Sequence, residues 1–468
     1  MDGEVRNRFT EGRLLKELIL FIIPIVITNL LQTLYHSADM IVVSLSKEAN
    51  AVGAIGTTGS FLSLILNTFI GFSIGANVVV ARGIGANDKD SVQKAVHTSL
   101  LMAVIFGAIG GIVGISITKT VLQAMGNRGS LLTLAVRYAY IYCAGLPFVA
   151  LTNYLSAIFR AKGNAKFPLL VLSLSGLVNV IFNLIFVLAL GMSVEGVAIA
   201  TVISNAVSCV AMLIKLRTQD DYTKFSFRRL KMNGRAFKEI VRVGLPAGIQ
   251  GALFSLSNML IQSSIVTVNN NSVPAGTDYQ PVVNGNAAAG NMDSFAYTSI
   301  NAVTQGAITF TGQNMGAKKP ERIRPIMYNC FLISAIIGVV MSWGFILLRH
   351  PFLALYGLHS GAEGSLQQLA YETATKRLLW VGIPYLFCGF MDNASGVLRG
   401  LGRSLTSTVI ALIGSCLLRV VWTLALFPLN PIVEMVYVCY PISWILTAAV
   451  SIVIIRIILK DLIKQKLD

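Results

Sequence analysis

Charged side chains are scarce in this 468-residue sequence: they make up 12% of the residues, whereas 54% are hydrophobic, and the mean hydropathy is +0.70. A soluble chain of this length would divide into two or three domains with about twice this share of charge. The shortage of charge excludes that class. The apolar residues recur in segments of about 20 residues, the length that a helix needs to cross a bilayer. The sequence is therefore that of an integral membrane protein.

Cysteine and histidine are also few. All six cysteines lie inside predicted spans, where a small hydrophobic side chain is the ordinary interpretation, so no disulfide framework is expected. The four histidines lack the spacing of metal ligands such as HExxH, and neither GxxxxGKS nor GxxxxGKT occurs. We therefore predict no metal site, no cofactor and no direct use of ATP.

Twelve apolar segments can be counted, and each is a predicted transmembrane helix. The predicted fold class is an all-α polytopic membrane protein. The charged N-terminal residues run into the first segment without a small-residue cleavage site, so we expect the first helix to be retained. The segments are residues 18–45, 51–81, 95–118, 134–159, 167–190, 195–216, 240–268, 286–315, 326–348, 372–398, 404–427 and 432–457.

The formal net charge of +16 follows the connections between these spans. Most of the 37 lysines and arginines fall in the tails and the even-numbered connections, and the largest group lies between residues 215 and 242. Cytoplasmic loops carry an excess of Lys and Arg over loops on the other side. We expect both termini and the central loop to face the cytoplasm, and we interpret the basic charge as topology rather than nucleic-acid binding.

The two halves of the chain repeat each other in motif and spacing. GFSIGANVVVARGIGANDKD resembles VTQGAITFTGQNMGAKKPER, and IFRAKGNAK resembles VLRGLGRSL. This repeat predicts an N-terminal six-helix lobe at residues 1–216, a cytoplasmic linker at 217–239, a C-terminal six-helix lobe at 240–457 and a cytoplasmic tail at 458–468. Two parallel repeats around a central cavity are a transporter architecture, and a monomer would contain the complete pathway.

The whole chain resembles the multidrug and toxic compound extrusion (MATE) family of secondary transporters. The resemblance implies export of organic cations or other amphipathic compounds across a bacterial inner membrane, in exchange for H⁺ or Na⁺ and by alternating access, and no enzymatic activity. The motifs that carry it are, in order, IPIVITNLLQTLYHSADMIVV, AVGAIGTTG, RGIGANDKD, FRAKGNAKFPL, VEGVAIATVIS, GLPAGIQGALFSLSNMLIQ and GVLRGLGRS.

The resemblance is closest to prokaryotic members with an ion site in the N-terminal lobe. It implies that site residues lie on the first, fourth, fifth and sixth helices, and that a proline bends the first helix. Asn183 departs from the family pattern, because an Asp is usual there; the site then carries one formal negative charge, which weakens the case for tight Na⁺ binding. The positions that match are Asp39, Tyr35, Tyr138, Asn153, Asn179, Thr201 and Pro24.

Asp39 lies within the first predicted span. A charged Asp at bilayer depth costs about 2.5–3.5 kcal/mol on insertion scales, so we expect it to face the lobe interior, where a proton can load and leave. The alternative is a permanently satisfied packing group bonded to His36 or Tyr35. Asn179 and Asn183 are one helical turn apart and share a face. They can ligate Na⁺ or bond a protonated Asp39; ordinary interhelical amide bonds are the alternative.

Three further residues in predicted spans have two open interpretations each. Pro24 removes a backbone hydrogen bond from the first helix, so it is either a hinge or a passive bend. Asp392 either contacts a cation or drug, or is exposed to water or paired. Arg419 needs a partner or a wet cavity, and a structural ion pair is the favoured interpretation.

A flippase for a lipid-linked oligosaccharide or similar amphiphile is the nearest rival function, since related folds do that work. Its cavity would need several Arg or Lys for a pyrophosphate, and Arg419 alone is clearly within a span. An intramembrane enzyme would need paired acids, a Ser/His pair or a metal cluster on facing helices, and Asp39 and Asp392 fall in different predicted lobes. A cation-coupled exporter is therefore the leading prediction.

Overall fold

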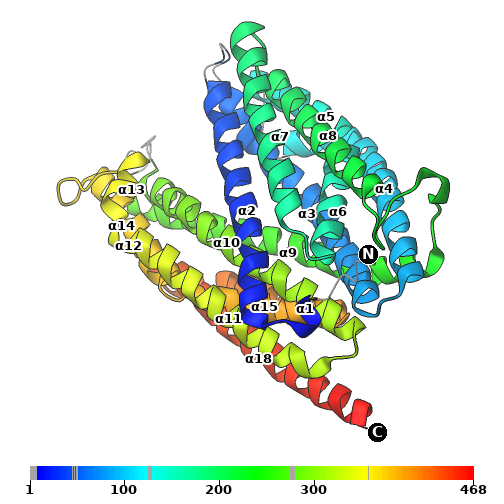
Figure 1. The fold of residues 1–468 in the computed structure, drawn as a ribbon. Coiled ribbons are helices and arrows are strands. Elements are labelled where there is room, and N and C mark those ends of the chain that lie inside the picture. The colour runs from blue at the N-terminus through cyan, green and yellow to red at the C-terminus, as the bar shows by residue number, and fades with distance from the viewer. Residues whose placement is uncertain are drawn as a thin grey trace. The chain divides into compact units, whose positions relative to one another are not determined.

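The computed structural model describes residues 8–44, 46, 48, 51–124, 129–274, 280–356 and 358–467. This part of the chain is almost entirely helical and contains no strand (Figure 1). Apolar sequences fold in this way in a bilayer because a helix satisfies every backbone N–H and C=O within its own segment. The predicted all-α fold class is confirmed.

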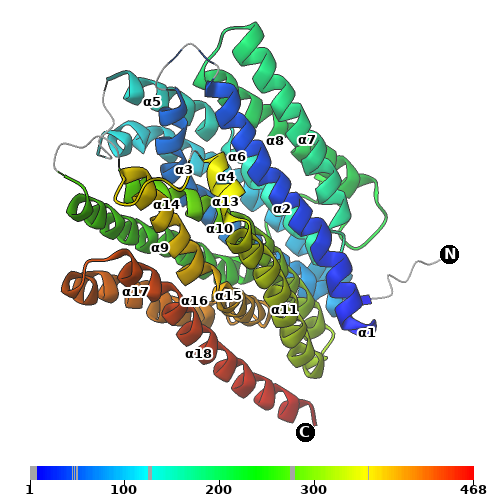
Figure 2. The same cartoon turned by 90° about the vertical axis from the view of Figure 1, so that its left-hand side faces the viewer.

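Figures 1 and 2 show the helices from two directions. Before the central linker lie α1 (Arg8–Glu11), α2 (Leu14–Ser44), α3 (Ala51–Gly85), α4 (Lys89–Ala124), α5 (Gly129–Ala144), α6 (Leu146–Ala161), α7 (Lys166–Leu184) and α8 (Val194–Thr218). After it lie α9 (Gly234–Ser272), α10 (Pro281–Gly316), α11 (Ile323–Gly338), α12 (Gly344–Leu347), α13 (Arg349–Leu355), α14 (Leu366–Arg377), α15 (Tyr385–Gly400), α16 (Ser404–Ala411), α17 (Leu418–Val421) and α18 (Val433–Leu467).

Among the described residues, nine helices are long and apolar enough to cross a membrane. The pair α5 and α6, bent by 52°, makes a tenth if it is counted as one span. The two remaining predicted spans, 286–315 and 372–398, fall on α10 and on α14 to α15, which are helical but more polar. Each of the twelve predicted segments is thus a helix or a broken helix.

Large apolar side chains remain exposed along these helices. Ile41 of α2 is 64% exposed, Ile112 of α4 67% and Leu347 of α12 74%. Such exposure is unfavourable in water but neutral against lipid tails, which are as apolar as the side chains. The protein is therefore a multi-pass membrane protein.

By their contacts the residues form two compact units. Unit 1 comprises Met1–Arg13, Leu20–Ala252 and Gly312–Lys319, and unit 2 comprises Leu14–Ile19, Leu253–Thr311 and Pro320–Asp468. The helices α2, α9 and α10 therefore contribute residues to both units. The lobe boundaries drawn from the sequence at the linker stay a prediction.

The internal repeat recurs in the backbone at matching turns. Asn87 follows α3 and Lys318 follows α10, and both have φ of 53°, a left-handed conformation that is uncommon for residues other than glycine. Gly163 after α6 and Gly402 after α15 have φ of 85° and 74°. The glycine-rich motifs of both halves are therefore turns at helix ends, as the sequence indicates.

Glycine allows α3 and α9 to pack backbone to backbone within unit 1. A Cβ atom on Gly71 would lie 2.3 Å from the backbone nitrogen of Gly248, and one on Gly75 would lie 2.3 Å from the carbonyl oxygen of Ile240. Membrane helices lack a hydrophobic driving force between them, so small residues that permit close approach supply the attraction.

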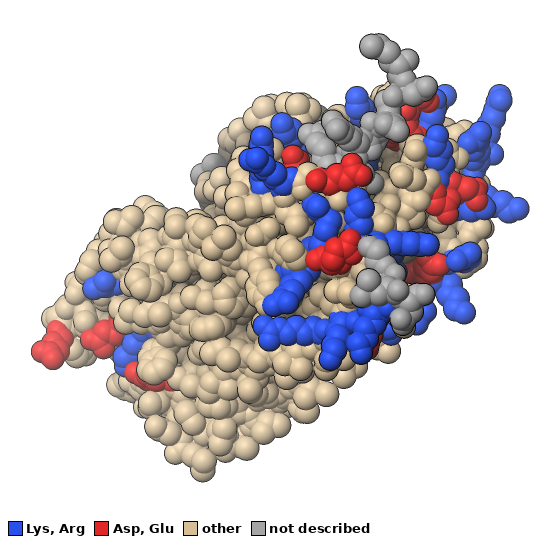
Figure 3. All heavy atoms as spheres, turned by 60° about the horizontal axis from the view of Figure 1, so that its bottom comes forward, with Lys and Arg blue, Asp and Glu red and all other residues tan. Residues whose placement is uncertain are grey.

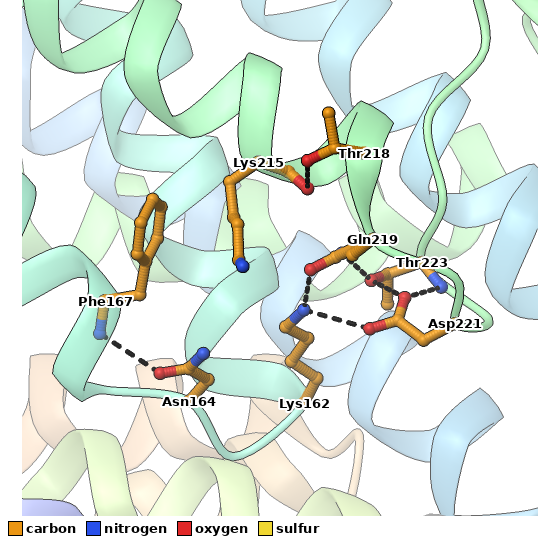
Figure 4. Close-up of polar contacts among 8 residues, drawn as sticks. All are labelled: Lys162, Asn164, Phe167, Lys215, Thr218, Gln219, Asp221 and Thr223. Atoms are coloured by element: carbon orange, nitrogen blue, oxygen red, sulfur yellow. Dashed lines mark hydrogen bonds and ion pairs between the residues drawn. The ribbon is translucent and has the colours of Figure 1, made fainter. Parts of the chain in front are cut away.

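The linker after α8 is tied to unit 1 by polar contacts (Figure 4). Lys162, in the turn after α6, donates to Gln219 and, at 3.0 Å, to Oδ2 of Asp221. Asp221 also accepts from the backbone nitrogen of Thr223 at 2.8 Å. Burial lowers the pKa of the Lys162 amine, and the adjacent Asp221 carboxylate opposes that shift.

A second attachment joins the linker to the start of α4. The ring of the buried His97 lies within hydrogen-bond distance of backbone atoms of Ser226, and Phe225 packs beside it with ring centroids 5.5 Å apart. Arg229 donates to Gln93 at 2.9 Å. The basic linker is thus a folded part of unit 1.

Lysine and arginine side chains gather over one part of the face shown in Figure 3, beside a broad area without charge. The linker between α8 and α9 contains Arg228, Arg229 and Lys231. A basic surface beside apolar helices is the pattern of the cytoplasmic side of a membrane protein.

Candidate functional site

Asp39 lies on α2 in unit 1, and its side chain is only 7% exposed. Its hydrogen-bonding neighbours are amide side chains of α7. Nδ2 of Asn183 donates to Oδ1 of Asp39 at 2.5 Å. In the described part of the chain, Asp39 bonds neither His36 nor Tyr35, and no Lys or Arg pairs with it. The carboxyl group is therefore held by neutral amides, which leaves its charge uncompensated by protein.

The amides extend as a chain of hydrogen bonds across α7 to α8. Asn183 also donates to Oδ1 of Asn179 at 3.2 Å, Asn179 donates to Oγ1 of Thr201 at 3.3 Å, and Thr201 donates to the carbonyl oxygen of Val197 at 3.0 Å. All three polar side chains are 9% exposed or less. Four of the residues predicted for the ion site therefore meet in one buried cluster. We call it the Asp39 cluster, and its members, which we expect to bind the coupling ion, are Asp39, Asn179, Asn183 and Thr201.

The amide of Asn179 fits either charge state of Asp39, because one of its two ends lies 2.9 Å from Oδ1 of Asp39. With the oxygen at that place, two acceptors face each other and the carboxyl must carry a proton to bond. With the nitrogen there, the amide donates to an ionised carboxylate, and its oxygen accepts from the backbone nitrogen of Thr201 at 3.3 Å. In this second arrangement the Asn179 nitrogen faces the nitrogen of Asn183 at 3.2 Å, so the bond between the two amides is absent.

Oδ1 of Asn183 is buried and has no hydrogen-bond partner. A buried acceptor left unsatisfied costs about 1–3 kcal/mol. It is bonded to the same carbon as the nitrogen that contacts Asp39, so a bound ion or water would find both an anionic and a neutral oxygen ligand there.

The other residues predicted for substrate contact or for the network lie outside the bonded chain of the Asp39 cluster. Tyr35 donates to the carbonyl oxygen of Ser173 at 3.1 Å, and Asn153 donates to that of Val149 at 2.9 Å. Tyr138 is buried and stacks on Tyr142, with the two ring centroids 6.1 Å apart.

Pro24 lies inside α2, which continues as a helix on both sides of it. The hydroxyl of Thr28 donates to the carbonyl oxygen of Pro24 at 2.7 Å. This bond runs back along the helix from residue 28 to residue 24, whereas the backbone bond that Pro24 lacks is the one from its own nitrogen to the carbonyl of Leu20. The hinge stays a prediction.

The ring of Tyr35 packs directly against Gly176 of α7. A larger residue at position 176 is therefore expected to destabilise the fold. A Cβ atom on Gly176 would lie 1.9 Å from Cε2 of Tyr35. Since the ring is also held by its bond to Ser173, we expect Gly176→Ala to destabilise the fold by about 1–3 kcal/mol through overpacking. Thermal unfolding in detergent can be followed with a thiol-reactive dye, because all six cysteines are free and buried.

The matched control is Gly59→Ala on α3, where a Cβ atom would meet nothing within 4 Å. We expect it to leave the melting temperature unchanged or raise it, since alanine favours helix over glycine. Equal melting temperatures for Gly176→Ala and wild type would contradict the close packing of Tyr35.

Unit 2 contains a buried ion pair that the sequence analysis missed. Nε of Arg377, on α14, donates to Oδ2 of Asp293, on α10, at 3.0 Å, and Nη1 donates to Oδ1 of Asn286 at 2.7 Å. The hydroxyl of Tyr437 donates to the same Asn286 oxygen at 3.2 Å. Asp293 lies inside the predicted span 286–315 and Arg377 inside the predicted span 372–398. Opposite charges within two predicted spans are the feature of the sequence that could have indicated this ion pair.

The remaining charged candidates, Asp392 and Arg419, also lie in unit 2. Asp392 on α15 is half-buried. Arg419 on α17 is only 3% exposed, yet no carboxylate in the described residues lies within ion-pair distance of it. It donates instead to Ser443 at 3.2 Å and Asn258 at 3.3 Å. The ion pair favoured from the sequence is therefore wrong.

The two structural repeats also match one family twice. The MatE family model matches residues 24–185 and again residues 246–424. The chain belongs to the MatE family. The predicted membership is confirmed. MatE proteins are transporters rather than enzymes.

Similar proteins span nearly the whole chain. The probable multidrug resistance protein YoeA of Bacillus subtilis (strain 168) is 26% identical over 409 residues, which are 85% of this chain and 83% of YoeA. The multidrug export protein MepA of Staphylococcus aureus (strain NCTC 8325 / PS 47) is 22% identical over 438 residues, 92% of each chain.

Among solved structures, a MOP superfamily transporter from Pyrococcus furiosus Vc1 (DSM3638), described as having a binding pocket of reverse polarity, superposes with a TM-score of 0.88. It is 22% identical, and the match covers 97% of this chain and 98% of that one. The MatE protein therefore has the two-lobed, twelve-helix transporter fold. In the part of the chain that the structure describes, no group of three His, Cys, Asp or Glu residues is placed to hold a metal ion.

Proposed function

We propose that this MatE protein is a secondary active exporter that moves organic cations or amphipathic compounds out of a bacterial cell by alternating access. Its similarity to proteins named for multidrug resistance and multidrug export supports the substrate class. The driving force is the inward movement of a coupling ion bound at the Asp39 cluster. The basic cytoplasmic linker and the charge bias of the loops support a plasma-membrane location with both termini inside.

The Asp39 cluster is the observation that carries the coupling proposal. A buried carboxyl held by amides alone requires a positive partner when it ionises, because an unpaired charge at bilayer depth is costly. The partner is an ion that enters and leaves, since no basic side chain of the described residues pairs with Asp39.

H⁺ is the ion that the hydrogen bonds favour. The nitrogen of Asn183 donates to Asp39, and an N–H group directed at the carboxylate repels Na⁺. The nitrogen of the Asn179 amide can take a second such position, 2.9 Å from Oδ1 of Asp39. Na⁺ is the alternative, with the oxygens of Asp39, Asn179, Asn183 and Thr201 as ligands after the amides turn.

Several predicted residues take supporting roles in this proposal. Tyr35, Tyr138 and Asn153 shape the polar surroundings of the Asp39 cluster and contact substrate, and Pro24 lets α2 bend as the cluster loads and releases its ion. Asp392 supplies a cation contact in the C-terminal half. A monomer is sufficient, because one chain holds both lobes.

The test uses purified protein in proteoliposomes with ethidium as the transported cation. An inwardly directed H⁺ gradient and an inwardly directed Na⁺ gradient are imposed separately. We expect ethidium to move against its gradient when H⁺ flows, and not when Na⁺ alone flows. Transport under Na⁺ alone would replace H⁺ by Na⁺, and no transport under either gradient would contradict ion-coupled export.

A flippase of an oligosaccharide lipid is less well supported. Such a substrate carries a pyrophosphate, and of Arg377 and Arg419, two arginines that lie inside predicted spans of unit 2, the first is already neutralised by Asp293. One remaining guanidinium is short of what two phosphates require.

A further inference from the structure

Two arginines are buried in the membrane-spanning part of unit 2, and the protein treats them differently. Arg377 has a carboxylate, Asp293, at 3.0 Å and an amide oxygen, that of Asn286, at 2.7 Å. Arg419 has neither a carboxylate nor a second charged group in contact among the described residues. The fold therefore neutralises one guanidinium and leaves the other with its charge.

The surroundings of Arg419 are neutral and aromatic. Its Nε donates to Oγ of Ser443 and its Nη1 to Oδ1 of Asn258. The guanidinium carbon lies 4.6 Å from the ring centroid of Tyr440 and 5.8 Å from that of Phe254. These rings attract the cation through their π faces but cancel none of its charge.

Arg419 has hydrogen-bond donors that are not used within the described residues and can bind a ligand. A guanidinium has five N–H groups in a planar fork that matches a carboxylate in two parallel bonds. Two of the five are used, and the bond to Asn258 is long at 3.3 Å. A carboxylate that replaces the Asn258 oxygen would gain both a shorter bond and an opposite charge.

The side of α9 that covers Arg419 is polar and accessible. Asn258 is exposed, and so is Gln262 one helical turn further along. Exposed amides at bilayer depth are expensive against lipid and are usual where a helix lines water. Only the side chain of Asn258 thus separates Arg419 from an accessible polar surface. Phe254 and Tyr440, both half-buried, lie beside the guanidinium.

Asp392 does not take the place of a partner for Arg419. Among the described residues it forms no ion pair with Arg419. The unit thus presents a separated negative and positive group, which suits a substrate that carries both charges.

We propose that Arg419, with Asn258, Tyr440 and Phe254, forms a binding site for the carboxylate of an aromatic amphipathic substrate. The inference rests on the proposed function as an exporter of amphipathic compounds and names the residues that bind a substrate's carboxylate. The carboxylate bonds the guanidinium fork in place of Asn258, and the flat apolar part of the substrate packs against the two rings.

The test compares two dyes that share one ring system: rhodamine 6G, an ethyl ester, and rhodamine 19, its free acid. Binding to the purified protein in an uncharged detergent is followed by fluorescence anisotropy. We expect Arg419→Gln to weaken the binding of rhodamine 19 at least tenfold and that of rhodamine 6G less than twofold. Arg456→Gln, which removes an exposed arginine of α18, is the matched control and is expected to change neither.

A second variant, Asn258→Asp, keeps the experiment decisive if Arg419→Gln fails to fold. The new carboxylate at this exposed position lies beside the Arg419 guanidinium. It therefore occupies the place that we propose for the carboxylate of the substrate. We expect the same selective loss of rhodamine 19 binding and an unchanged melting temperature. Equal effects on the two dyes, or none, would overturn the proposal. Because no ion gradient is used, these outcomes are independent of the vesicle test of coupled export.

Discussion

Replacement of Asp39 by asparagine is expected to reduce ion-driven ethidium efflux to the level of vesicles without the protein. Asparagine preserves the size of the side chain and can still bond Asn183 and Asn179, but it carries no charge and exchanges no proton. In the wild type, the Asp39 carboxyl is the one ionisable member of the Asp39 cluster. Without this carboxyl, the charge of the cluster no longer changes when the ion binds or leaves. Coupling is therefore lost, while substrate binding is retained.

The matched control is Asp220→Asn, the same chemical change on the linker, where the side chain is 95% exposed and pairs with Lys224. We expect it to transport as the wild type does. The contrary result is an Asp39→Asn protein that folds, binds ethidium with the wild-type affinity and still concentrates it under an ion gradient. That result would show that Asp39 serves only in helix packing. The coupling site would then have to be sought at Asp392.

Replacement of Asp293 by asparagine is expected to cost about 3–5 kcal/mol of stability, because it leaves the buried Arg377 charge without a counterion. Arg377 is 15% exposed and Asp293 9%, and the guanidinium also lies 6.0 Å from the ring centroids of Tyr437 and Tyr440. Arg377→Gln should destabilise by a similar amount. The double variant should lose much less than the sum of the two single losses, since no charge is then stranded.

Lys376→Gln is the control for the pair. Lys376 precedes Arg377 in sequence but is 45% exposed and pairs with Glu434, so its loss should cost at most about 1 kcal/mol. Melting temperatures from cysteine exposure would rank the variants. Additive losses in the double variant would mean that Asp293 and Arg377 do not act as a pair.

Helix positions and the Asp39 cluster follow from local signals in the sequence. A run of apolar residues as long as α4 has only one stable form in lipid, and the spacing of Asn179 and Asn183 puts both amides on one face of α7. The approach of Asp39 to that face depends on the packing of α2 against α7. Spacing along the chain does not give that packing, and the family resemblance supplied it.

The charged groups of unit 2 show where sequence reasoning fails. Arg377 lies near the start of the predicted span 372–398, and its partner Asp293 lies 84 residues before it. Nothing local links them. Arg419 was expected to have a carboxylate because buried charges are usually paired. Its partners proved to be neutral residues from α9 and α18, which can be found only once the helices are placed.

The measurement that tests the central claim most directly is the reverse reaction. Proteoliposomes are given an ethidium gradient and no ion gradient, and internal pH and ²²Na⁺ uptake are followed in wild type and Asp39→Asn. The account predicts that ethidium moving down its gradient through the wild type drives H⁺ in the opposite direction, and that the variant moves no ion. Ethidium movement through the wild type without movement of either ion would contradict coupling at Asp39.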